Sequence, residues 1–141
     1  DGKILLSELF GKEVFNQKIT DRVKSFNDAL AIVGAVPNVQ ILLDYNGQDR
    51  DMISAQAFAK LTIIARALNE GWTPNWSNSS EYKYYPWMEY SVGSGFSFHD
   101  SGFGGTCTSV GSRLCFKSRE LAEYAGKQFE SIYKDVYLIE K

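Results

Sequence analysis

Two cysteines and one histidine are the residues of this chain whose types could support nucleophilic chemistry. Cys107 and Cys115 follow His99, the single histidine, in a glycine-rich segment. A thiolate beside an imidazole would form a nucleophile and its base. Such a set also arises easily by chance, and the neighbours Asp100 and Ser101 would point to alternate sides of an extended chain, so they form no triad with His99.

Free, half-buried thiols are therefore the expectation for Cys107 and Cys115. A disulfide across a hairpin is the alternative if the protein is exported. One histidine and two cysteines cannot supply the four protein ligands of a structural zinc site. We expect no enzyme activity, no metal and no cofactor.

Stacking on flat ligands is a second kind of chemistry, and the aromatic residues favour it. Residues 72–98 contain three tryptophans, four tyrosines and two phenylalanines. If this stretch forms strands, the outer face of the sheet carries aromatic planes beside cations, as in surfaces that bind single-stranded nucleic acid or sugar rings. The candidate binding residues on that face are Tyr85, Trp87, His99, Arg113 and Lys117. The alternative is that Tyr85 and Trp87 belong to the core, covered by the segment 72–80 or by an N-terminal helix.

The elements that would position these residues begin with helices in the N-terminal half. Ser25 and Asp28 form a capping-box pattern in front of a short helix. Apolar residues at spacings of three and four predict a longer, central helix over 51–69. Between them, 37–50 is predicted to be a loop, with a brief strand as the alternative. The apolar patch at 5–10 predicts a turn of helix or an arm that docks on the domain.

Three segments show the alternation or turn spacing of antiparallel strands. They are 82–92, 95–99 and 106–116, and glycine-rich turns join them. The even-numbered residues of the first segment are expected to face the core. Pro86 among them argues for an edge position or a bulge, because proline has no N–H to donate to a neighbouring strand.

A C-terminal amphipathic helix over 119–134 follows Ser118, whose hydroxyl is a suitable N-cap. The sequence therefore predicts an α+β fold in which helices pack on one face of a small antiparallel sheet, with its strands within 82–116. The length of 141 residues suits a single globular domain over 1–141.

Composition and charge limit the partners. The formal net charge is −2, and acidic and basic residues divide evenly along the chain. The absence of a basic arm disfavours capture of duplex nucleic acid or of an anionic membrane. No apolar run approaches the roughly 18 residues that span a bilayer, and no signal-peptide pattern opens the chain. We expect a cytoplasmic protein, although a leader could have been removed before Asp1.

Several motifs carry a resemblance to a known family. They are LNEGW at 68–72, YKYYPW at 82–87, VGSRLCFKS at 110–118 and ELAEYAGKQF at 120–129. With them the chain resembles, over roughly residues 19–138, a family of small uncharacterised proteins encoded by gut bacteria and by their bacteriophages and mobile elements. The resemblance implies a bacterial or phage origin and cytoplasmic residence. It brings no activity and no functional residues.

We therefore expect a non-catalytic binding or interaction module of the phage or mobile-element type, which uses the sheet face and the segment 93–111. A protein partner or self-association suits the near-neutral charge, because aromatic and arginine anchors are typical of protein interfaces. No membrane interaction is expected. The alternative is a single-stranded nucleic-acid-binding protein, which requires that Tyr85, Trp87, Arg113 and Lys117 be exposed together.

Overall fold

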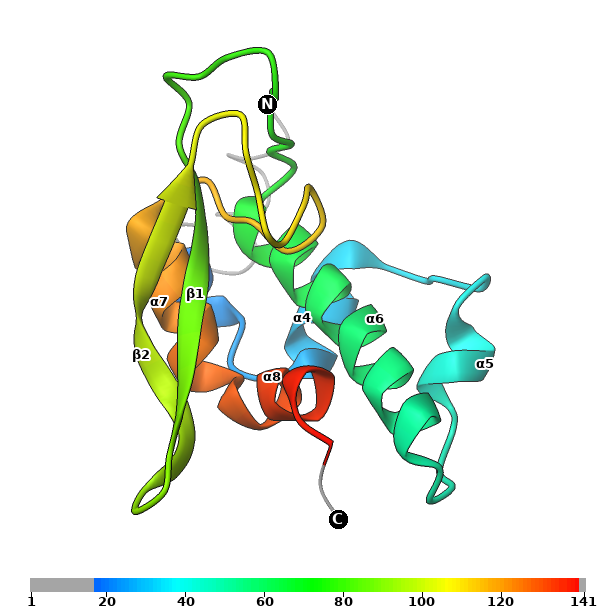
Figure 1. Cartoon of the computed structure of the whole chain (residues 1–141). Helices are drawn as coiled ribbons and strands as arrows, with labels where there is room; N and C mark the ends of the chain where they lie inside the picture. Colours follow the sequence, from blue (N-terminus) through cyan, green and yellow to red (C-terminus); the bar gives the residue numbers. More distant parts are fainter. Residues whose placement is uncertain (1–16, 140–141) are drawn as a thin grey trace.

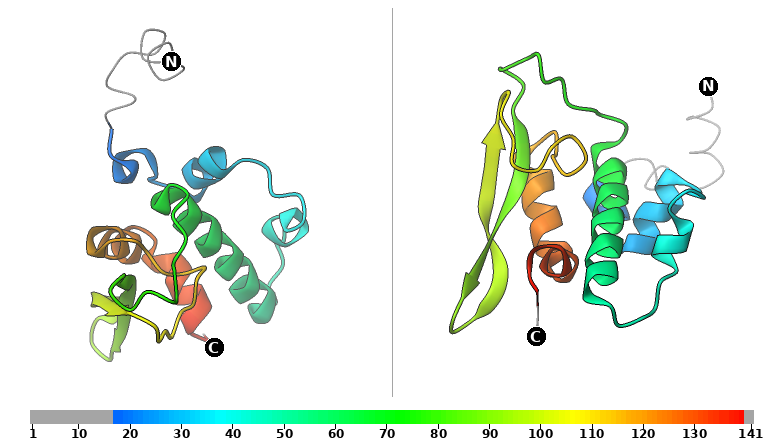
Figure 2. Two further views of the ribbon diagram at one scale, coloured as in Figure 1. Left: turned by 90° about the horizontal axis from the view of Figure 1, so that it is seen from above. Right: turned by 45° about the vertical axis from the view of Figure 1, so that its right-hand side comes forward.

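Helices and one hairpin make up residues 17–139, the part of the chain that the computed structural model describes. In chain order the elements are α3 Ile19–Arg22, α4 Phe26–Val33, α5 Gln40–Leu43, α6 Arg50–Asn69, β1 Lys83–Ser91, β2 Gly95–Gly104, α7 Arg119–Gln128 and α8 Glu130–Tyr137 (Figure 1). The hairpin lies on one side of the molecule, α7 and α8 lie beside it, and α6 lies beyond them with α4 and α5 on its far side (Figure 2). The apolar patch predicted at 5–10 is outside the described residues.

The helices of the N-terminal half begin where the sequence predicts. Ser25 Oγ accepts a hydrogen bond from the Asp28 amide at 3.1 Å, and the Asp28 carboxylate accepts one from the Ser25 amide at 3.1 Å, which confirms the capping box before α4. The central helix predicted over 51–69 is confirmed as α6, capped by Asp49. The loop predicted over 37–50 contains a short helix, α5, at residues 40–43, and the brief strand considered there is wrong.

The reason for α5 lies in side-chain contacts across the sequence. Gln56 on α6 donates from its amide to the carbonyls of Leu42, Leu43 and Tyr45 at 2.7–3.1 Å. These bonds satisfy the carbonyl groups at the end of a helix, which otherwise lack partners. No local pattern in the sequence reveals such a contact.

The predicted sheet consists of two antiparallel strands, β1 and β2, joined by a turn at 92–94. Gly95 follows the turn with φ 79°, a conformation that glycine adopts without steric cost. Trp87 pairs with Asp100 and Met88 with Phe98, so His99 is an extra residue that forms a bulge in β2.

The third strand predicted over 106–116 is wrong. Those residues form turns and bends, and a single bridge joins Phe116 to Tyr84. Thr108 Oγ1 accepts hydrogen bonds from the amides of Val110 at 3.0 Å and Gly111 at 2.8 Å, and Gly111 has φ 76°. A hydroxyl that binds nearby amides stabilises a turn at the expense of a strand.

The helix predicted over 119–134 begins as expected but is interrupted. Ser118 Oγ accepts from the Leu121 amide at 3.3 Å, and the chain leaves the helical conformation at Phe129, between α7 and α8. The break lets α7 pack on the hairpin while α8 turns to pack on α6. Phe129 itself is buried in the corner, so the predicted apolar stripe is used on two partners instead of one.

Helices cover one face of the hairpin, which confirms the predicted α+β architecture. A Cβ added to Gly126 of α7 would lie 2.5 Å from Phe98 of β2 and 2.7 Å from Pro86 of β1, so the helix backbone lies directly on the sheet. The hydrophobic core continues from there to α6, the centre of the helical part. Its fully buried members include Val23, Leu61, Ile64, Leu68, Phe116 and Tyr133.

Candidate functional site

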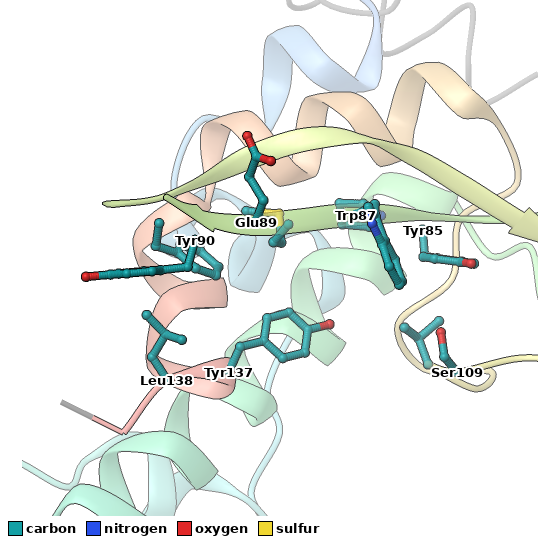
Figure 3. Close-up of a pocket in the computed structure, with 11 residues that line it drawn as sticks. Tyr85, Trp87, Glu89, Tyr90, Ser109, Tyr137 and Leu138 are labelled. Carbon is teal, nitrogen blue, oxygen red and sulfur yellow. The ribbon is translucent and has the colours of Figure 1, made fainter. Parts of the chain in front are cut away.

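A groove of about 330 Å³ runs along the free edge of β1 (Figure 3). One wall consists of the successive residues 85–90 of β1 together with Phe96. Ser109 and Val110 of the following loop and Tyr137 and Leu138 at the end of α8 form the opposite side. Because successive strand residues alternate between faces, a wall that includes all of 85–90 lies along the strand edge and not on one face of the sheet.

Within residues 17–139, the edge of β1 that faces away from β2 is paired at one end only. The Tyr84 amide donates to the Phe116 carbonyl at 3.0 Å, and the Phe116 amide donates to the Tyr84 carbonyl at 2.7 Å. Pro86, two residues after Tyr84, would direct its N–H to the same side, but proline has no N–H. In an antiparallel pair every second residue directs its N–H and C=O away from the partner strand. Met88 and Tyr90 follow in phase with Tyr84, so their backbone groups point into the groove.

Exposed aromatic side chains flank this edge. Trp87 is 54% exposed and Tyr90 is 65% exposed, whereas Tyr137 on the opposite side stacks on the buried Tyr133 at 6.2 Å between ring centroids. Tyr85 meets Trp87 edge to face at 6.2 Å. Its ring also lies across Gly102 of β2, where an added Cβ would come within 2.6 Å of it. Trp87 is therefore not covered, while Tyr85 is half-buried against the neighbouring strand.

One charged residue lines the groove, and it is acidic. The carboxylate of Glu89 lies 3.2 Å from Nδ1 of His99, the bulge residue of β2. Both side chains are exposed. Glu89 pairs with Ser97, and His99 lies two residues further along β2 on the same face. Among residues 17–139, no lysine or arginine lines this groove.

The structure brings together only part of the predicted site. Tyr85 and Trp87 line the groove, and His99 reaches it through Glu89. Arg113 instead lines a shallow depression between α5, α6 and α8, and Lys117 lies 3.8 Å from the Glu70 carboxylate at the end of α6. Sequence reasoning missed Tyr90 and Tyr137. Tyr90 has the parity expected to face the core, and the position of Tyr137 depends on the break in the C-terminal helix.

A buried lysine holds the loops beside the groove. Lys83 is 1% exposed, and its Nζ donates to the carbonyls of Asn78 at 2.9 Å and Gly105 at 2.8 Å. The Trp76 ring lies 5.2 Å from the same nitrogen and the Glu81 carboxylate 3.5 Å. A hydrogen bond from the Asn75 amide, aided by Lys83, lowers the pKa of Glu81. Strand parity alone places Lys83 on the solvent side, so no pattern in the sequence indicates this role.

The two thiols differ in their surroundings and are both free. Burial raises the pKa of the Cys115 thiol to about 11, which keeps it protonated at neutral pH. Cys107 is exposed. Within residues 17–139, no three histidine, cysteine or acidic side chains gather in a way that could hold a metal ion.

None of the helices in the described part of the chain is both long and apolar enough to cross a membrane. Comparisons with protein-family models, with curated proteins and with solved structures found no match to this chain. The groove along β1 is therefore interpreted from its own geometry and chemistry.

Proposed function

We propose that the protein is a non-catalytic binding module that takes a segment of a partner protein into the groove along β1. The observation that carries this proposal is the exposure of Trp87 and Tyr90 on an unpaired strand edge, opposite Tyr137. Clustered aromatic residues around a water-accessible apolar groove are typical of sites that anchor protein ligands.

The charges beside the groove favour a protein ligand over nucleic acid. Binding of a single strand needs cations along its phosphates as well as aromatic planes. Glu89 is the charged residue of the groove, whereas Arg113 and Lys117 lie against other parts of the molecule. The Glu89 carboxylate points over β2 toward His99, away from Tyr137 and Leu138 (Figure 3), so the groove offers a nucleic-acid strand no cation among the described residues.

The biological setting is part of the same proposal. The family resemblance supports a module of the phage or mobile-element type. Two free thiols in the described chain support residence in the cytoplasm, where thiols are kept reduced. A binding role also fits the Cys115 thiol, which burial keeps in its unreactive, protonated form.

The test is selection of binders from a displayed library of random octapeptides on the immobilised protein, followed by affinity measurements on two variants. Trp87→Ala removes an aromatic side chain of the groove. Phe103→Ala removes one of similar exposure, 51% against 54%, from the other face of the hairpin. We expect Trp87→Ala to weaken the binding of the selected octapeptides at least about tenfold, since a central tryptophan often contributes more than 1.4 kcal/mol to binding. Phe103→Ala should change their affinity little.

Selected octapeptides that bind both variants equally would overturn the proposal, as would a selection that yields no octapeptide. Nucleic acid is tested on the same variants by titration with oligo(dT) and oligo(U) at low and moderate salt. Saturable quenching of tryptophan fluorescence that weakens with salt and disappears in Trp87→Ala would assign the groove to single-stranded nucleic acid instead.

A further inference from the structure

The groove along β1 offers backbone groups as well as aromatic side chains. Its wall contains every residue from 85 to 90, and Met88 and Tyr90 direct their N–H and C=O groups into it. A long, exposed strand edge with apolar neighbours is a template for another strand, and proteins usually block or cover such edges. Here Pro86 blocks one position, and the following residues Trp87–Ser91 are left accessible.

We propose that the partner segment binds as an additional β-strand, paired with the edge of β1 on the side opposite β2. This inference rests on the proposed function and specifies its binding mode. The single bridge between Tyr84 and Phe116 already uses this edge in the same way, and it ends where the chain turns at 109–115. The added strand would extend the pairing from that bridge toward the hairpin turn.

The groove also defines the chemistry of the segment. The free length of β1 from Trp87 to Ser91 is five residues, or about 17 Å of strand. Side chains of the segment that point to one face meet Trp87, and those of the other parity meet Phe96 and Met88. The expected ligand is therefore a short extended segment that alternates apolar residues.

A second copy of this chain fits the same edge less well. Val110, Tyr137 and Leu138 stand opposite β1 and leave a space of about 330 Å³ between them. A second hairpin would bring its own partner strand against that wall.

Two substitutions of one exposed residue separate backbone pairing from side-chain contact. Tyr90→Ala removes the ring and keeps the N–H. Tyr90→Pro removes both, and Pro86 shows that β1 accepts proline in this phase. We expect Tyr90→Pro to bind the tightest selected octapeptide at least about tenfold more weakly than Tyr90→Ala does. Circular dichroism and thermal unfolding check that both variants are folded.

A second measurement uses the wild-type protein, so it does not depend on the folding of a variant. Each amide of the same octapeptide is N-methylated in turn. Strand addition predicts that methylation weakens binding at every second residue only, because alternate amides face β1. Equal binding by Tyr90→Pro and Tyr90→Ala, with no alternation in the methylation series, would overturn strand addition.

The possible failures can be told apart. If binding still requires Trp87 but the methylation series shows no alternation, the proposed binding function is supported and strand addition is excluded. If no octapeptide requires Trp87, both fall together. A dimer in sedimentation equilibrium that Tyr90→Pro abolishes and Tyr90→Ala preserves would replace the partner segment with a second copy of the chain and overturn the inference.

Discussion

Lys83 donates from its buried Nζ to the carbonyl of Gly105 at 2.8 Å, across the base of the loop that supplies Ser109 and Val110 to the groove. The same nitrogen donates to the Asn78 carbonyl in the loop before β1. One side chain thus ties two loops to the first residue of a strand. Because this nitrogen is buried, the two hydrogen bonds offset the cost of removing it from water.

Replacing Lys83 by methionine should lower the free energy of unfolding by about 1–3 kcal/mol, because the carbonyls of Asn78 and Gly105 lose their donor in a buried place. Urea denaturation measures the change. Lys18→Met is the matched control, and since Lys18 is exposed we expect a change within about 0.5 kcal/mol. Equal stability of the two variants would contradict a structural role for Lys83.

Glu81 should make part of this loop anchor sensitive to acid. Its pKa is lowered in the folded state, chiefly by the Asn75 amide, so its carboxylate stabilises the fold at pH values above the ordinary pKa of 4.5. That contribution is lost as the pH falls through the lowered value. Urea midpoints measured from about pH 7 down to about pH 3 should show a difference between wild type and Glu81→Gln that closes toward acid. A constant difference would contradict this assignment.

The fold could be predicted from local patterns wherever a local pattern determined the structure. Ser25 and Asp28 cap α4 by contacts within one turn, and the spacing of apolar residues in α6 reflects burial on several sides. The prediction of a third strand was wrong because Thr108 and Gly111 form a turn that competes with strand pairing. The break at Phe129 depends on two packing partners, the hairpin and α6, which the sequence does not identify.

The positions of the candidate residues were predicted in part for the same reason. The period-two pattern placed Tyr85 and Trp87 on one face correctly, and Trp87 is exposed there. The grouping of Arg113 and Lys117 with them required the third strand and was lost with it. Tyr137 joined the groove through a tertiary contact, and no spacing in the sequence indicates that α8 ends beside β1.

Gly126→Ala should destabilise the protein although alanine favours helices by up to about 1 kcal/mol over glycine. The added methyl group would lie 2.5 Å from Phe98 and 2.7 Å from Pro86, so α7 must move away from the hairpin. We expect a net loss of about 1–3 kcal/mol in urea denaturation. Gly93→Ala, where no atom lies within 4 Å of the new group, is the control and should be nearly neutral. A stabilised Gly126→Ala variant would mean that the helix does not lie directly on the sheet.

Alkaline pH should weaken the fold through groups whose pKa values burial raises. The pKa of Cys115 rises from 9.0 to about 11, and the pKa of the buried Tyr133 rises as well. When folding raises the pKa of a group, the protein keeps its full stability at pH values below the pKa of that group in the unfolded state. Stability is then lost as the pH rises from that value toward the pKa in the folded state. For Cys115 the loss is roughly 2 kcal/mol between pH 9 and pH 11. Urea midpoints should therefore fall over this range, and fall less in Cys115→Ala.

The two thiols should react at very different rates in the folded protein. At pH 8 a thiol of pKa about 11 is ionised in about one molecule in a thousand, and Cys115 is also fully buried. Cys107 is exposed. Ellman's reagent should therefore titrate one thiol quickly in native protein and two in urea, and Cys107→Ser should remove the fast reaction. Two rapidly reacting thiols in the native protein would contradict the burial of Cys115. No reactive thiol in native protein or in urea, with two appearing only after reduction, would establish a disulfide that the structure lacks.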